Sequence, residues 1–227
     1  TSKYDNLLRY EGYELILKIL RYLYQIDAYI SIAEVARERG FVFAEALPLG
    51  GNILEIEGMF HPLIENAIPN SIQADAEHNV VFLTGANMAG KSTFMKTFGI
   101  VVYLAHMGFP LPVKKMRFSV QNGMYTTINL PDNMMLGYSH FYAEVQRLKK
   151  VAEQVGRIGN LVIVFDELFR GTNVKDAHEA TLAVMEAFAE KKNCIFMIST
   201  HIIEAGEDLK KRCDNISYVY LPTVMKD

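Results

Sequence analysis

One segment constrains this chain more than any other. Between residues 80 and 107 an apolar run, a glycine-rich loop and a helical pattern follow one another. The run at residues 80–84 is short and apolar, which suits a buried strand. The loop at residues 85–92 reads Gly-Ala-Asn-Met-Ala-Gly-Lys-Ser and fits the pattern G-x-x-x-x-G-K-[ST] in full. This strand, loop and helix context favours a phosphate-binding loop over an ordinary glycine turn with a lysine nearby.

The residue types in the loop match what a nucleotide's terminal phosphates require. The glycines let the backbone curl so that successive N–H groups point at the β-phosphate, and the following helix adds its positive dipole end. Lys91 would neutralise the β- and γ-phosphates, and the Ser92 hydroxyl would bind Mg²⁺. We therefore expect ATP and Mg²⁺ as ligands. The expected nucleotide contacts in the loop are Gly85, Ala86, Asn87, Met88, Ala89, Gly90, Lys91, Ser92 and Thr93.

A pair of acids follows a second apolar run. Residues 161–165 read Leu-Val-Ile-Val-Phe, and Asp166 and Glu167 come next. In a P-loop fold such a strand lies near the phosphate loop, so Asp166 can hold Mg²⁺ through water and Glu167 can polarise the attacking water as general base. Ordinary solvated acids after a strand are the plainer interpretation. The complete loop motif upstream favours the catalytic one.

A histidine closes a third apolar run. Residues 194–199 predict a buried strand, and Thr200 and His201 follow it. A lone histidine is more often a surface or core residue. At the carboxyl end of a central strand, where α/β sheets bind ligands, it can sense the γ-phosphate and position water. The predicted catalytic residues are Glu167, His201 and Lys91, and the predicted metal ligands are Ser92 and Asp166.

The order of the predicted elements defines the fold class. Residues 5 to about 40 carry apolar side chains at helical spacing, with Gly12 as a possible break and Gly40 as a C-terminal stop, so one kinked helix and two consecutive helices are both open. Residues 45–51, with Pro and Gly, indicate a linker. Beyond it strands alternate with helices, which predicts an α/β fold with a mostly parallel sheet flanked by helices. We expect a helical segment at 1–44 and a P-loop ATPase domain at 45–227.

Individual elements are predicted from the same patterns. Asp176 is placed to cap a helix over residues 176–191, with Glu179 completing a capping-box-like pair. Gly123 interrupts a β-rich stretch. The remaining predicted ranges are strands at 52–57 and 216–221, β-rich residues at 112–130, and helices at 91–107 and 139–155.

Composition narrows the class of partner. The formal net charge is −3, whereas a chain that grips DNA over its own surface is usually basic. No stretch of 18 apolar residues predicts a transmembrane helix, and no signal peptide is visible. Cys194 and Cys213 lie far apart in sequence, which favours free thiols in a reducing compartment and hence a cytoplasmic location. The chain opens without methionine, so we expect a piece of a larger protein.

Three segments together resemble the ATPase domain of the MutS family of DNA mismatch repair proteins. They read TGANMAGKST at 84–93, DELFRGTN at 166–173 and STH at 199–201. The family has a TGPNMGGKST-like loop, a DE-x-x-RGT segment and a TH-containing strand end in this order, and His61-Pro62 is similar to its HP element. The resemblance implies an ABC-ATPase-like P-loop fold, with residues 1–40 as the end of the lever and connector region.

The resemblance also implies roles for further residues. Asn87 would lie near the phosphates. Ser139 matches the signature serine that reaches the partner's γ-phosphate in family dimers, although a helix N-cap is its plainer interpretation. The segment 170–173 would line the dimer interface beside the nucleotide. The implied assembly is a homodimer with composite ATP sites, in which DNA is contacted by domains of the parent protein that are absent here.

The sequence departs from the family pattern at several positions. Ala86 and Ala89 replace the usual proline and one glycine of the loop, and Phe169 stands where the family usually has glycine. The stretch after Ser139 reads HFYAEV, where mismatch repair members read closer to TFMVEM. These departures indicate a divergent MutS-like branch.

Several functions fit these patterns unequally. The leading one is an ATP-binding and ATP-hydrolysing module of a MutS-like mismatch repair or DNA-binding protein, acting as a dimeric ATP-driven switch. The alternative is a nucleotide-dependent dimerisation module without mismatch recognition; Glu167 and His201 argue against incidental turnover. A transporter or chromosome-structure ATPase would need an LSGGQ-like signature before residue 161, and a small-molecule kinase an arginine-rich lid. Neither feature is seen.

Overall fold

The computed structural model describes residues 2–6, 9–10, 12–86, 89–128, 140–169 and 172–222. It contains two sheets, helices that pack on the larger sheet, and an N-terminal helical segment. The described elements in chain order are α1 (Ser2–Asn6), α2 (Tyr13–Arg39), β1 (Glu45–Leu47), β2 (Leu54–Met59), β3 (Asn70–Ala74), β4 (Val80–Gly85), α3 (Lys91–His106), β5 (Lys115–Ser119), β6 (Gly123–Thr127), α4 (His140–Arg157), β7 (Leu161–Phe165), α5 (Val174–Ala189), β8 (Ile195–Ser199), α6 (Ile203–Arg212) and β9 (Ile216–Leu221).

The larger sheet has the strand order β6-β7-β8-β4-β9, and all its described pairings are parallel. Parallel strands need crossover connections, and α3, α4, α5 and α6 supply them. The prediction of a parallel sheet flanked by helices is therefore confirmed. The helices predicted near residues 91–107 and 139–155 are α3 and α4.

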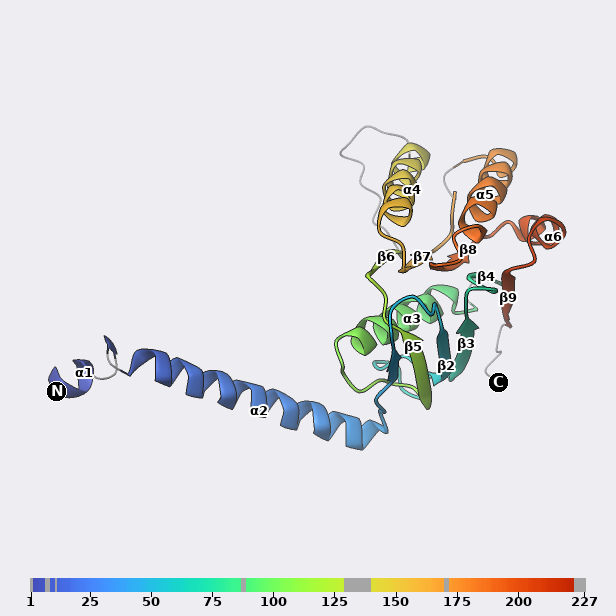
Figure 1. Cartoon of the computed structure of the whole chain (residues 1–227). Helices are drawn as coiled ribbons and strands as arrows, with labels where there is room; N and C mark the ends of the chain where they lie inside the picture. The colour runs from blue at the N-terminus through green and yellow to red at the C-terminus, as the bar shows by residue number, and fades with distance from the viewer. Residues whose placement is uncertain are drawn as a thin grey trace.

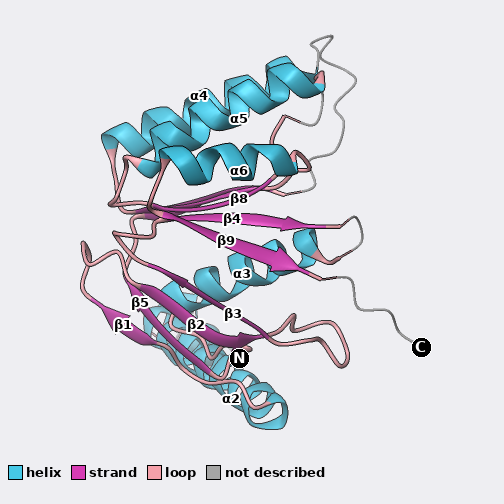
Figure 2. Ribbon diagram, turned by 90° about the vertical axis from the view of Figure 1, so that its right-hand side faces the viewer, coloured by secondary structure: helices cyan, strands magenta, loops and turns pink. Residues whose placement is uncertain are grey.

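Alternating side chains of the interior strand β4 fill two separate cores. Val81 and Leu83 pack with α3 and the smaller sheet. Val80 and Phe82 pack on the opposite face, among residues of α5 and α6. Figure 2 shows this layering, with α3 between the two sheets and α4, α5 and α6 over the other face of the larger sheet. Burial on both faces explains the continuous apolar runs of these strands.

The smaller sheet has the order β1-β5-β2-β3 and is mixed. β1 pairs in parallel with β5, while β2 is antiparallel to both β5 and β3. The linker predicted at residues 45–51 is wrong for Glu45–Leu47, because these residues pair with Arg117–Ser119 as an edge strand. Gly123, predicted as an interruption, opens strand β6 of the other sheet.

The N-terminal helix α2 projects away from the two sheets (Figure 1). None of its residues is buried, although apolar side chains occur around it. Gly40 ends the helix in the left-handed conformation at φ 68°, and its N–H bonds to the Ala36 carbonyl. Arg39, the last helical residue, donates from Nη1 to the Pro62 carbonyl at 2.5 Å. Of the two arrangements left open by the sequence, the structure has two consecutive helices, α1 and α2. The domain boundary between residues 44 and 45 stays a prediction.

Helix α5 begins earlier than predicted. Its N-cap is Asn173, whose side-chain oxygen accepts the Asp176 N–H at 3.0 Å. Asp176 stands three residues into the motif and accepts from Asn173 Nδ2 at 2.6 Å. The prediction of Asp176 as the cap is wrong, because the N-cap is Asn173 and Asp176 lies three residues later, where its carboxylate bonds to the Asn173 side chain rather than capping the helix.

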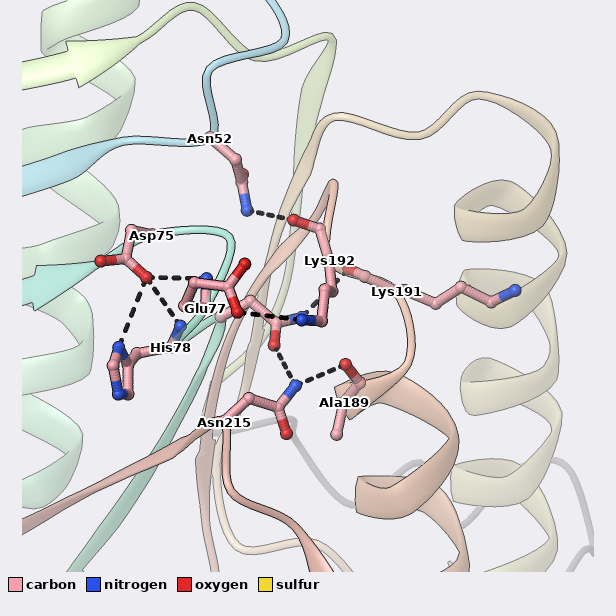
Figure 3. Close-up of polar contacts among 9 residues, drawn as sticks. Asn52, Asp75, Glu77, His78, Ala189, Lys191, Lys192 and Asn215 are labelled. Carbon is pink, nitrogen blue, oxygen red and sulfur yellow. Dashed lines mark hydrogen bonds and ion pairs between the residues drawn. The ribbon is translucent and has the colours of Figure 1, made fainter.

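A polar brace ties the amino ends of the strands together (Figure 3). Buried Asn79 precedes β4; its Oδ1 accepts from Asn215 Nδ2 at 2.8 Å, and its Nδ2 donates to the Lys191 carbonyl at 3.0 Å. Asn215 Nδ2 also lies 2.6 Å from the Ala189 carbonyl. Asn52 Nδ2, next to the smaller sheet, donates to the Lys192 carbonyl at 2.8 Å. This brace lies at the edge opposite the strand ends that carry the sequence motifs.

Other features complete the fold. Cys194 and Cys213 are free, and burial raises the pKa of the Cys194 thiol. Strand β3 and helix α6 have no counterpart in the sequence prediction. Within the described residues, no helix has both the length and the apolar character that crossing a membrane needs.

Candidate nucleotide site

The three predicted motifs converge on one edge of the larger sheet. The loop follows β4, the acidic pair follows β7, and His201 comes shortly after β8. β8 lies between β4 and β7, and the register pairs Ser199 with Leu83 on one side and Ile198 with Phe165 on the other. All three strands are parallel, so their carboxyl ends meet at the same edge, which is where α/β sheets bind ligands.

Two glycines of the loop are required by the backbone. Gly85 has φ 155°, and a Cβ atom there would lie 2.6 Å from the Leu221 carbonyl oxygen. It therefore allows strand β9 to pair along the full length of β4. Gly90 has φ 90° and precedes the first turn of α3, a conformation that L side chains rarely adopt. The loop thus delivers the chain directly into the start of a helix, where free N–H groups favour an anion.

Lys91 lies beneath the loop rather than in solvent. Its side chain is buried, and Nζ donates to the Gly85 carbonyl at 2.8 Å and to the Ala86 carbonyl at 3.2 Å. The ammonium group is therefore held beside the backbone that would surround the phosphates. Ser92 is half-buried in the first turn of α3, and Thr93 next to it is exposed.

Ser199 organises the acidic pair. Its hydroxyl, which is fully buried, donates to Asp166 Oδ1 at 2.7 Å and accepts the Glu167 N–H at 2.9 Å. The Asp166 N–H bonds to the Thr127 carbonyl at 3.2 Å. Glu167 has a left-handed φ of 53°. The Asp166 carboxylate and the backbone of Glu167 are thus both held by β8, the strand that separates the acidic pair from the loop.

His201 lies at the same edge but is exposed. The Thr200 hydroxyl accepts the Ile202 N–H at 3.2 Å and starts the turn into α6. His201 is placed by its neighbours, because Thr200 and Ile202 are both buried. Its imidazole is therefore presented outward from the edge that carries the loop and the acids.

A cavity of about 310 Å³ opens beside the loop. Ala89, Gly90 and Thr93 line one side of it, and residues between β2 and β3 line the other, among them Phe60 and His61. On this second wall, sequence reasoning identified only His61-Pro62. Ile64, Ala67 and Ile68 come from the same irregular segment, whose sequence has no periodic pattern, and the pairing of β2 with β3 brings this segment beside the loop. The remaining lining residues are Met59, Asn70, Phe94, Thr97, Leu221 and Pro222.

Some predicted site residues lie outside the described part of the chain. These are Asn87, Met88, Ser139, Arg170 and Gly171. Their predicted roles stay predictions.

A phosphate-loop strand and helix, with an acidic strand end on the same edge of a parallel sheet, define a P-loop ATPase. Residues 81–226 match the family model described as MutS domain V. The chain therefore belongs to the MutS family and carries its domain V, which is the ATPase domain and implies nucleotide binding.

Individual relatives are consistent with this assignment. The DNA mismatch repair protein MutS of Aquifex pyrophilus is 32% identical over 187 residues, which cover 81% of this chain and 21% of the relative. MutS of Thermus aquaticus is 31% identical over 84% of this chain and 23% of the relative. MutS of Lactococcus lactis subsp. cremoris (strain SK11) is 30% identical over 88% and 24%, respectively. The chain thus spans about a quarter of the length of these relatives.

Proposed function

We propose that this chain hydrolyses ATP at the edge formed by the ends of β4, β7 and β8. In this proposal the phosphates lie on the loop at 85–93, with Lys91 neutralising their charge. Glu167 takes the proton of the attacking water as general base, and His201 orients that water and contacts the γ-phosphate. The observation that carries the proposal is the bridging of Asp166 and Glu167 by Ser199, one strand away from the loop.

The residues present suit Mg²⁺. Ser92 and Asp166 offer hard oxygen ligands, and Ser199 holds the Asp166 carboxylate in place. One hydroxyl and one carboxylate suit Mg²⁺, which typically takes one or two carboxylates and completes its shell with water and substrate phosphates. When bound, it would offset the negative charge of the β- and γ-phosphates.

The cavity beside the loop suits the base and sugar of the same nucleotide. Its walls are mostly apolar, and Phe60 and His61 offer rings. A nucleotide whose phosphates lie at the start of α3 would extend towards Ala89, Gly90 and Thr93, which form the near wall. Ligand pockets commonly combine apolar walls with a few polar groups in this way.

For the parent protein we propose a homodimer that works as an ATP-driven switch. Ser139 and the segment 170–173 would complete the partner's ATP site, and the N-terminal helices would pass the change to DNA-contacting domains. ATP drives such a switch only through different affinities for its open and closed states. The relatives are named DNA mismatch repair proteins. Mismatch recognition by this protein, and its cytoplasmic location, belong to this proposal.

The test measures ATP hydrolysis at a series of protein concentrations for the wild type and for Glu167→Ala. We expect the wild-type rate per chain to rise with concentration, since composite sites need two chains. We expect Glu167→Ala to lose about 100-fold or more of the rate. Glu204→Ala removes an exposed carboxylate in the first turn of α6 and serves as the control, with a rate near wild type.

Equal rates for the wild type and Glu167→Ala at every concentration would refute the proposed catalytic role. Tight ATP binding by the wild type without phosphate release would favour the alternative, a dimerisation module in which ATP only joins two subunits.

A further inference from the structure

The segment that carries the acidic pair has two strained residues. Glu167 has φ 53° and Phe169 has φ 60°. A non-glycine residue in this left-handed region costs roughly 1–3 kcal/mol and persists only where the surrounding structure holds it. Phe169 is an extreme case because its side chain is large and its position is nearly fully buried. The segment therefore depends on contacts that oppose its relaxation.

Every backbone N–H from residue 166 to residue 169 has an acceptor. Three acceptors belong to strands or strand ends of the larger sheet. The fourth is a carboxylate of helix α4, outside the sheet. The bonds are Asp166 N–H to the Thr127 carbonyl at 3.2 Å, Glu167 N–H to Ser199 Oγ at 2.9 Å, Leu168 N–H to the Ser199 carbonyl at 3.1 Å and Phe169 N–H to Glu144 Oε1 at 2.7 Å.

Helix α4 holds Phe169 in two ways. Glu144, half-buried in the second turn of α4, accepts the Phe169 N–H. Phe141, one turn earlier, packs its ring against that of Phe169, with centroids 5.7 Å apart and planes at 51°. At 2.7 Å, the Glu144 bond is the shortest of the four that hold the segment.

We propose that Glu144 is a positioning residue for ATP hydrolysis, whose carboxylate fixes the Phe169 N–H and thereby the left-handed turn that aims Glu167. This inference rests on the proposed role of Glu167 as general base. Glu144 contacts the backbone two residues from the base and acts through it. Without this acceptor the turn keeps only the Phe141 ring contact with α4 and relaxes, which displaces the Glu167 carboxylate.

The same contact links α4 to the base. α4 begins at His140, directly after Ser139, the residue proposed to reach the partner's nucleotide. A shift of the start of α4 would carry Glu144 and Phe141 with it and so move the turn at Glu167.

The experiment compares Glu144→Met with Glu144→Gln in the full chain. Methionine has a similar length but accepts hydrogen bonds weakly, whereas the glutamine side chain keeps an oxygen that can accept the Phe169 N–H. Glu153→Met, at an exposed position of the same helix, is the matched control. Three quantities are measured for each variant: kcat and KM for ATP, the Kd for a fluorescent ATP analogue, and the melting temperature.

We expect Glu144→Met to lower kcat about 10- to 100-fold, the effect of misplacing a catalytic group by a fraction of an ångström to 1 Å, with Kd nearly unchanged. Glu144→Gln should restore kcat to within about fivefold of wild type, and Glu153→Met should match the wild type. A wild-type kcat in Glu144→Met would overturn the proposal, as would parallel loss of kcat, ATP binding and melting temperature, which indicates a purely structural contact.

The two proposals fail separately. If Glu167→Ala is inactive while Glu144→Met has wild-type kcat, the role of Glu144 is refuted and that of Glu167 stands. If Glu167→Ala retains wild-type activity, the assignment of the base is refuted, and with it the positioning role derived from it.

Discussion

At the scale of single residues, the acidic pair owes its geometry to Ser199. The hydroxyl of Ser199 is at once the donor to Asp166 and the acceptor for the Glu167 N–H. A single hydroxyl oxygen therefore bonds to the N–H of the strained residue Glu167 and also orients the Asp166 carboxylate. Ser199 belongs to the STH segment that carries the family resemblance, but no sequence pattern predicts that its hydroxyl bridges the acidic pair.

Ser199→Ala is predicted to destabilise the fold by about 1–3 kcal/mol, because it leaves the partly buried Glu167 N–H without its acceptor. The rate of ATP hydrolysis should fall as well, since the Asp166 carboxylate loses its donor. Urea unfolding measures the first effect. Ser217→Ala, at a half-buried position of β9, is the control and should change stability by less than about 0.5 kcal/mol. Equal stability of the two variants would contradict the assigned role.

Packing of the Phe169 ring stabilises the fold, whereas its left-handed backbone conformation destabilises it. Phe169→Ala should cost about 3–5 kcal/mol, because it empties a position packed against Phe141. Phe169→Gly loses the same ring but also relieves the strain of φ 60°, so it should be more stable than Phe169→Ala by about 1 kcal/mol. Thermal melts of both variants measure the difference. Greater stability of the alanine variant would show that the left-handed strain is absent.

At the scale of elements, the start of α5 depends on a reciprocal pair. Asn173→Ala removes the oxygen that accepts the Asp176 N–H and should cost about 1 kcal/mol. Lys175→Ala, in the same turn, removes only an exposed ion pair at 4.0 Å and should change stability little. Chemical denaturation compares the two. If Asn173→Ala proves as stable as Lys175→Ala, the cap contributes nothing.

The polar brace at the opposite edge of the larger sheet is expected to contribute more to the stability of the fold than the Asn173 cap does. Asn79→Ala leaves the buried Asn215 amide and several carbonyls with fewer partners, at a cost of about 2–4 kcal/mol. The rate of ATP hydrolysis at saturating ATP should be nearly unchanged, because the brace lies away from the motif edge. A variant with wild-type melting temperature would refute the role of the brace.

The elements that sequence reasoning predicted are those whose patterns are local. Strands β4, β7 and β8 are continuous apolar runs because both faces are buried, and α3 follows a glycine that must adopt φ 90°. Strand β1 was missed because three residues beside Pro and Gly become a strand only by pairing with β5. β3 was missed for the same reason, since its pairing with β2 is a long-range property.

At the scale of the whole molecule, the site was predictable to the level of motifs. Loop, acidic pair and histidine each follow an apolar strand, and parallel topology brings strand ends to one edge. Sequence patterns could not predict how the cavity is assembled, the Ser199 bridge or the Glu144 contact. Each of these joins residues that are far apart in the sequence, and no periodic pattern relates such residues. Helix α2 carries apolar side chains, but none of its residues is buried against the rest of the chain.

The most direct test of the account is a calorimetric titration of Mg-ATP into the wild type and into Lys91→Ala. The side chain of Lys91 lies beneath the loop, on the Gly85 and Ala86 carbonyls. We predict one site per chain in the wild type and an affinity at least about tenfold weaker in Lys91→Ala, because a buried charge that faces the phosphates is lost. Absence of Mg-ATP binding by folded wild-type protein, or equal affinity in both proteins, would contradict the account.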